Sequence, residues 1–217
     1  MKKIIYAAVL VLCATTFAAY AQSGVIRELT GEVELKPAGA SSFVRAQAGS
    51  EVRQDTIVST GFRSTALIAV GSSVITVRPL TRLSLAEIQT SSGTENLTMN
   101  LQAGRVRVDV NPPAGERANV TLKSPVATAS VRGTSFEFDT RSVKVHEGTV
   151  VFVGRSGLAI PVSAGTESRI GKEGNVVDPL VIAEAALQPS LPVGAESIGG
   201  PPPAPATGDF TIELTFE

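Results

Sequence analysis

The sequence has few aromatic residues and almost no sulfur-containing ones. It contains no tryptophan, a single cysteine (Cys13) and two tyrosines, Tyr6 and Tyr20. All three residues lie within the first 21 positions, so phenylalanine is the only aromatic residue of the remaining chain. The lack of cysteine there excludes disulfides and thiol chemistry. The lack of tryptophan and tyrosine weakens the case for a site that stacks on sugar rings.

An excess of one charge is also missing. The first 21 residues contain two of the 19 basic residues, which leaves 17 (19 − 2) against 20 acidic ones and a net charge of −3. This balance argues against nucleic acid or an anionic membrane as a partner. After residue 21 no apolar run approaches the length that spans a bilayer, so stable membrane insertion of the remaining chain is not expected.

Residues 1–21 have the pattern of a secretory signal peptide. Two lysines precede an apolar run, Ile4 to Ala19, and small residues stand at positions 19 and 21. We expect cleavage after Ala21 and export to the periplasm or the outer surface. Lipidation at Cys13 is not expected, because Leu12 occupies the preceding position, where a lipoprotein signal has a small residue.

Residues 22–174 read as a succession of short strands in which apolar and polar residues alternate. The run Ser124–Val153 shows this most clearly, with turn signals at Arg132-Gly133-Thr134 and at Glu147-Gly148. A second run, Asn96–Val110, predicts a long hairpin that turns at Gly104. The expected fold is all-β, either a twisted antiparallel β-sandwich or jelly roll or a short β-solenoid-like domain.

The C-terminal part changes character twice. Asp178-Pro179 is a helix start signal and predicts one short helix over residues 175–188. Residues 189–209 are rich in proline, glycine and alanine and predict an extended linker. Residues 210–217 form an amphipathic strand pattern whose apolar face comprises Phe210, Ile212, Leu214 and Phe216.

A single strand needs a partner for its backbone and its apolar face. The strand expected at residues 210–217 has three candidate destinations: the protein's own sheet, which we favour, the sheet of another chain, and the outer-membrane machinery that reads C-terminal strands. The second destination includes self-association, in which the strand of one copy completes the sheet of the next.

Four segments together resemble the FecR domain family. They are QDTIVSTGFRSTALIAVGSSVITVRPLTRLSL, LQAGRVRVDV, VTLKSPVATASVRGTSFEF and VHEGTVVFV, and they cover about half of the chain between Gly49 and Val153. The resemblance implies a periplasmic all-β domain that is not an enzyme. The best-known members of the family are transmembrane regulators of a sigma factor. This sequence shows no sigma-binding segment, so we expect a free-standing envelope module.

The family signature in this chain is expected to be mainly structural. Gly133 and Gly148 would permit tight turns, and the Thr134 side chain would bond to the turned backbone. For Arg132 we favour a structural role, holding loop carbonyls or pairing with Glu147, over ligand binding. The signature consists of Arg132, Gly133, Thr134, Phe136, Glu147 and Gly148.

Residues for catalysis are scarce. His146 is the only histidine and is expected to be a solvated surface residue, so neither a Ser-His-Asp site nor a zinc site is expected. Glu137 and Asp139 share one strand face, where a polar outer surface is the simplest interpretation. We therefore expect no cofactor, no metal and no enzymatic activity, and interpret the protein as an envelope module that binds another protein. The alternatives are a glycan- or peptidoglycan-binding module and a structural protein that self-assembles through residues 210–217.

Overall fold

The computed structural model describes residues 23–187. The expected signal peptide, the linker at residues 189–209 and the strand expected at residues 210–217, with Phe210, Ile212, Leu214 and Phe216, lie outside the described residues.

The described part of the chain consists of strands and one short helix. Their bounds are β1 Gly24–Thr30, β2 Val33–Lys36, β3 Val44–Arg45, β4 Glu51–Val52, β5 Ile57–Thr60, β6 Thr65–Val70, β7 Ser73–Val77, β8 Arg82–Ser91, β9 Thr94–Ala103, β10 Arg105–Val110, β11 Arg117–Lys123, β12 Ala127–Arg132, β13 Ser135–Asp139, β14 Ser142–Glu147, β15 Thr149–Gly154, β16 Ala159–Ser163, β17 Glu167–Ile170, β18 Val176–Val177 and α2 Pro179–Leu187.

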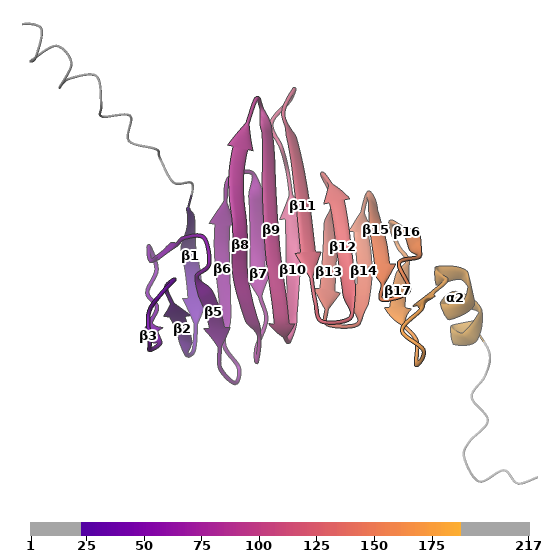
Figure 1. The fold of residues 1–217 in the computed structure, drawn as a ribbon, viewed down its shortest axis with the longest axis horizontal. Coiled ribbons are helices and arrows are strands. Elements are labelled where there is room, and N and C mark those ends of the chain that lie inside the picture. The colour runs from indigo at the N-terminus through magenta and orange to yellow at the C-terminus, as the bar shows by residue number, and fades with distance from the viewer. Residues whose placement is uncertain (1–22, 188–217) are drawn as a thin grey trace, which may run out of the picture.

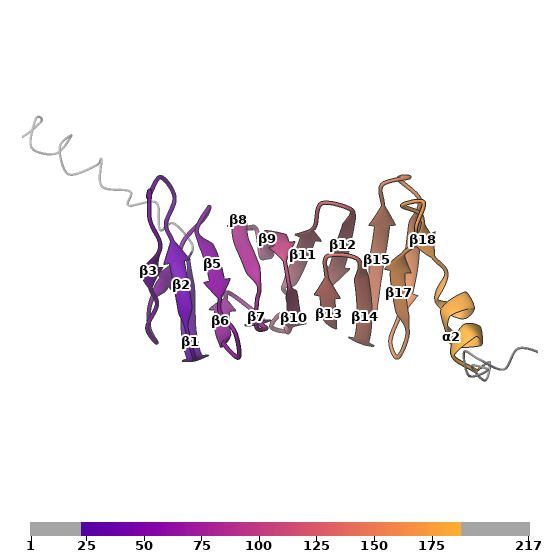
Figure 2. The same ribbon diagram turned by 90° about the horizontal axis from the view of Figure 1, so that it is seen from below.

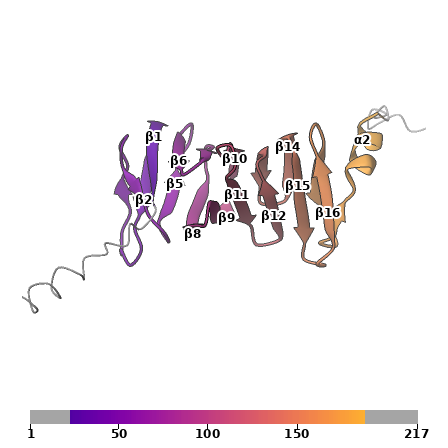
Figure 3. The ribbon, with the colours of Figure 1, turned by 90° about the horizontal axis from the view of Figure 1, so that it is seen from above.

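The strands form two sheets of nine strands each. The first sheet has the order β18-β17-β14-β13-β10-β7-β6-β1-β4, and the second has the order β16-β15-β12-β11-β9-β8-β5-β2-β3. The chain advances steadily from one end of the elongated molecule to the other (Figure 1). Seen from below and from above, the sheets form two stacked layers (Figures 2 and 3). The all-β expectation is confirmed, and of the architectures considered the molecule adopts the sandwich.

The alternating sequence pattern explains the two layers. In β10, Val106, Val108 and Val110 are buried between the sheets, while Arg105, Arg107 and Asp109 lie on the outer face. Every other strand residue therefore contributes to one continuous core, as a period of two requires. Phe138 of the first sheet and Phe152 of the second meet edge to face across this core, with ring centroids 6.2 Å apart.

The expected hairpin at Asn96–Val110 is wrong. The strands on either side of Gly104 belong to different sheets, because β9 pairs with β8 and β11, whereas β10 pairs with β7 and β13. Gly104 has φ +88°, and Thr81 crowds the position that its Cβ would take. The turn therefore fixes a crossing between sheets. It also makes β9 and β11 parallel neighbours, while the other strand pairs of the described chain are antiparallel.

A short helix near the C-terminus is confirmed as α2, but it begins only at Pro179, and residues 176–177 of the predicted range form β18. The Asp178 side chain accepts a hydrogen bond from the Leu180 backbone N–H at 2.8 Å, and Pro179 occupies the first helical position. This is the N-cap arrangement that the Asp-Pro pair indicated. The helix lies beyond the last strands, at the C-terminal end of the sandwich (Figure 1).

Candidate functional site

Two turns of the family signature pack against each other. Gly133 connects β12 to β13 with φ +62°, and Gly148 connects β14 to β15 with φ +77°. A Cβ atom on Gly148 would lie 2.5 Å from the Thr134 Cγ2 atom, so a larger residue cannot be placed there without a shift. The Thr134 carbonyl accepts a hydrogen bond from the Val110 N–H at 3.0 Å. These contacts join the two crossing turns to the end of β10.

The Thr134 hydroxyl does not act as the sequence suggested. Its Oγ1 atom is buried and has no hydrogen-bond partner in the described part of the chain. The turn is held by the Thr134 backbone and by van der Waals contact of its methyl group. Phe136 is fully buried in the core, between Val108 of β10 and Val145 of β14 in the strand register.

Arg132 and Glu147 are both exposed and are not paired with each other. No hydrogen bond or ion pair of the described residues involves either side chain. The expected structural pairing of Arg132 with Glu147 is therefore absent. Arg132 stands opposite Asn119 at the end of β12, on the outer face of the second sheet.

The outer face of the first sheet carries side chains of both charges that engage one another. Arg78 lies 3.2 Å from Glu137, and Arg105 lies 3.7 Å from Asp139. The two carboxylates share one face of β13, as predicted, and each is approached by an arginine. The result is a sheet face of paired charges.

A second polar cluster lies on the same face near the signature turns. The Arg107 guanidinium is 3.1 Å from Asp109, and the Ser135 hydroxyl donates to Asp109 at 2.5 Å. Burial alone would raise the pKa of Asp109, but the bonds from Arg107 and Ser135 outweigh it and hold this pKa below its usual value. The hydrogen bond with Asp109 likewise raises the pKa of Arg107.

His146 is less exposed than the sequence suggested. Its side chain is 32% exposed, and its Nε2 atom is shielded from solvent and has no hydrogen-bond partner in the described chain. The Nε2 atom lies 3.8 Å from Glu137 Oε1. The Ser135 hydroxyl bonds directly to Asp109, without His146 between them. Ser135, His146 and Asp109 therefore do not form a serine–histidine–aspartate relay.

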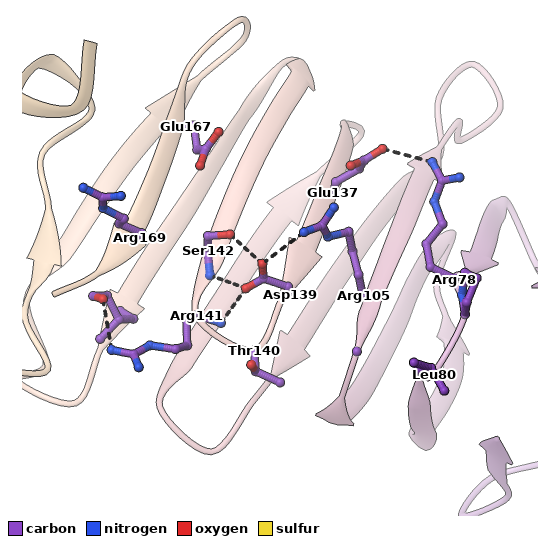
Figure 4. A pocket seen from close by; sticks show the side chains of 13 residues that line it. Arg78, Leu80, Arg105, Glu137, Asp139, Thr140, Arg141, Ser142, Glu167 and Arg169 are labelled. Carbon is purple, nitrogen blue, oxygen red and sulfur yellow. Dashed lines mark hydrogen bonds and ion pairs between the residues drawn. The ribbon is translucent and has the colours of Figure 1, made fainter. Parts of the chain in front are cut away.

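An open hollow of about 1040 Å³ lies beside the paired charges, where the strands of the first sheet reach their turns. Figure 4 shows the arginines and carboxylates that line it. Asp139 accepts bonds from the Arg141 N–H and from the Ser142 N–H, both at 2.7 Å, which fixes the β13–β14 turn. Arg169 and Glu167 line the same hollow, and their side chains have no hydrogen-bond or ion-pair partner among the described residues.

A ridge of two exposed apolar side chains, which we call the loop ridge, adjoins this hollow. It consists of Phe62, 73% exposed, and Leu80, 62% exposed. The two loops are joined, because the Leu80 N–H donates to the Gly61 carbonyl at 3.2 Å. The buried Thr60 hydroxyl donates to the Arg78 carbonyl at 2.6 Å, which holds the loops rigidly. Leu80 also lines the hollow (Figure 4).

The loop ridge is strained. Leu80 has φ +55° and Arg63, next to Phe62, has φ +52°. Both loops carry the chain from one sheet to the other. In the two signature turns, which also carry the chain between the sheets, the left-handed residue is a glycine. A large side chain in this conformation costs about 1–2 kcal/mol. This strain could not be predicted from the sequence, because no sequence pattern marks a left-handed position that lacks a glycine.

Residues 23–187 contain neither a metal-binding cluster nor a membrane-spanning helix. No cluster of histidine, cysteine, aspartate and glutamate side chains with the grouping needed for a metal ion occurs there. The one helix in this range is too short to cross a bilayer.

Comparison with known proteins identifies the domain. The family model described as FecR protein matches residues 55–151. Two crystal structures of a candidate anti-sigma factor from Parabacteroides distasonis ATCC 8503 resemble the chain, with 13% and 14% identity and a TM-score of 0.46 for each. They cover 60% and 58% of this chain, which spans only 64% and 62% of their length. No curated protein matches. The matched residues include both signature turns and the loop ridge, and residues 55–151 of this chain form a domain of the FecR family.

Proposed function

We propose that this protein is an exported, non-enzymatic module of the cell envelope that binds another protein and takes part in sensing a signal. The FecR domain at residues 55–151 is the observation that carries the proposal. The arrangement of polar groups on the first sheet also supports it. The carboxylates Asp109, Glu137 and Asp139 are each engaged by an arginine, which leaves none of these three groups unpaired.

The contact surface that we assign to the protein partner is the loop ridge with the adjoining hollow. Exposed apolar side chains on rigid, strained loops are typical of binding sites, because the cost of ordering them has been met in the free protein. Phe62 supplies a large aromatic anchor, and the Arg63 guanidinium lies over its ring, 5.4 Å from the centroid. The charged hollow beside Leu80 then provides the polar rim.

Affinity capture from the native cell envelope tests the proposal. The mature full-length chain would be cross-linked in the envelope, purified, and compared with the double variant Phe62→Ser/Leu80→Asn. We expect a defined protein to be recovered with the wild type and to be lost with the double variant. A matched control replaces Leu158, which is 59% exposed on another loop, by serine and should leave recovery unchanged. Equal recovery with the wild type and the double variant would refute the assigned surface, and recovery of no protein would refute a protein partner.

A further inference from the structure

The outer face of the second sheet differs in chemistry from that of the first. Across β9, β11 and β12 the strand register aligns three rows of outward-facing residues. The rows are Asn96, Asn119 and Arg132; Thr98, Thr121 and Ser130; and Asn100, Lys123 and Thr128. Seven of these nine side chains are neutral and polar, two are basic and none is acidic. Since the first sheet presents paired charges, the two faces of the sandwich are suited to different ligands.

This polar face is hollowed. A depression of about 680 Å³ is lined by side chains of β11, β12 and β15. The polar groups that line it are Asn119, Thr121, Ser130, Arg132 and Thr149. Val151 contributes an apolar patch and is 42% exposed.

The polar groups of the depression are mostly free to bind a ligand. Asn119 donates to Asn96 at 2.9 Å, which orients its amide. The hydroxyls of Thr121, Ser130 and Thr149 make no hydrogen bond with other described residues. On the first sheet, by contrast, Asp109 and Asp139 each receive several bonds from neighbouring side chains and backbone. Unused hydrogen-bonding groups are therefore available in the depression.

Arg132 is the charged group of this depression. Its guanidinium has no carboxylate partner in the described part of the chain, although the residue belongs to the family signature. Gly133 supplies the left-handed backbone of its turn, and Gly148 packs against Thr134, but no contact of the fold accounts for the Arg132 side chain. A guanidinium at the rim of a neutral polar depression is suited to receive a carboxylate from a ligand, in a two-bond geometry that lysine cannot match.

The remaining lining groups indicate what carries that carboxylate. Threonine and serine hydroxyls and asparagine amides both donate and accept, so they match sugar hydroxyls, which do the same. Val151 offers an apolar surface for the C–H face of a sugar ring. A peptide would instead require a sheet edge or a deep apolar pocket, and the depression lies on the face of interior strands of the sheet.

We propose that the outer face of β11, β12 and β15 binds a carboxylate-bearing glycan chain. Arg132 pairs with the carboxylate, and Asn119, Thr121 and Ser130 bond to the sugar hydroxyls. Because the mature chain has no tryptophan or tyrosine to stack on sugars, binding to a single site is weak and depends on chain length. This site is independent of the protein-binding surface assigned to the loop ridge, which lies along the turns beside the first sheet.

The test uses the mature full-length chain and affinity electrophoresis in gels that contain polygalacturonate. Three other gels contain methyl-esterified polygalacturonate, dextran or poly-glutamate. We expect retardation by polygalacturonate and at least a tenfold weaker effect of its methyl ester, because esterification removes the charge that Arg132 binds. Poly-glutamate, which has carboxylates without sugar hydroxyls, should retard the protein no more than dextran does.

Three variants locate the site. Arg132→Gln should lose at least tenfold in apparent affinity, and the double variant Thr121→Val/Ser130→Val should lose at least fivefold. Lys144→Gln, which removes a positive charge from the first sheet, is the matched control and should bind like the wild type. Unchanged thermal unfolding would show that the variants fold.

Several results would overturn the proposal. They are no retardation by polygalacturonate, equal binding of poly-glutamate, an equal loss with Lys144→Gln, or no loss with Thr121→Val/Ser130→Val. The last two would reduce the interaction to general charge attraction. None of them bears on the protein partner of the loop ridge.

Discussion

Replacing Leu80 by asparagine should make the protein more stable while it removes part of a binding surface. Leu80 has φ +55°, a conformation that costs a leucine about 1–2 kcal/mol and that asparagine adopts far more readily. The opposing cost is small, because Leu80 is 62% exposed and the lost burial amounts to roughly 0.5–1 kcal/mol. The net gain is about 0.5–1 kcal/mol.

Scanning calorimetry of residues 22–217 at pH 7 measures this effect. For a protein of this size, 1 kcal/mol corresponds to about 2–4 °C, so the Tm of Leu80→Asn should rise by about 2 °C. The matched control is Val44→Asn, at an apolar residue that is 52% exposed in β3 and has no left-handed backbone. Its Tm should fall, since valine favours a strand more than asparagine does.

The result that refutes the reasoning is a fall in the Tm of Leu80→Asn by as much as that of Val44→Asn. The Leu80 side chain would then contribute to folding through contacts that outweigh its backbone strain. A stabilised variant that also loses its partner would show that the strain is retained for binding.

The other predictions concern the signature turns, the loss of stability at acid pH and the core. Gly148→Ala should lower the free energy of unfolding by about 2–4 kcal/mol in urea titrations, because it adds left-handed strain and a clash with Thr134. The control Gly165→Ala has the same backbone conformation but no atom within 4 Å, and should cost only about 1 kcal/mol. Equal losses in the two variants would show that the Thr134 contact contributes nothing. The folded pKa of Asp109 is lowered, so its contribution is complete above the unfolded value of about pH 4 and is lost as pH falls through the folded value. The Tm of Asp109→Asn should therefore fall less than that of the wild type between pH 5 and pH 2. Parallel curves of Tm against pH for the two proteins would contradict this. Phe138→Ala should cost about 3–5 kcal/mol in the same urea titrations, because it removes a fully buried ring; a loss below about 1 kcal/mol would contradict the packing of the two sheets.

The strands were predictable from the sequence because alternation is a local pattern. The outward placement of Arg105 and Arg107 and the buried valines of β10 follow from a period of two alone. The helix start at Asp178 was likewise encoded in two adjacent residues. Such features require no knowledge of which strands become neighbours.

Strand partners could not be predicted, because packing across the whole domain decides them. A turn at Gly104 has the same local appearance whether the next strand returns to the same sheet or crosses to the other. The crossing is fixed by Thr81, whose hydroxyl accepts a hydrogen bond from the Arg105 N–H at 3.0 Å, 24 residues away in sequence. The same limit applies to the surfaces. The loop ridge and the polar depression each combine residues that are far apart in the sequence, so neither can be recognised as a sequence motif.

Site-specific photo-cross-linking tests the proposed function most directly. Phe62 would be replaced by the photoreactive analogue p-benzoylphenylalanine, which preserves its shape, in the full-length protein in its native cell. The same analogue at Leu158, which is also exposed, serves as the control. A binding module whose contact is the loop ridge should give one discrete protein adduct at position 62 and none at position 158. No adduct at position 62, or the same adducts at both positions, would contradict the assignment of this surface to a protein partner.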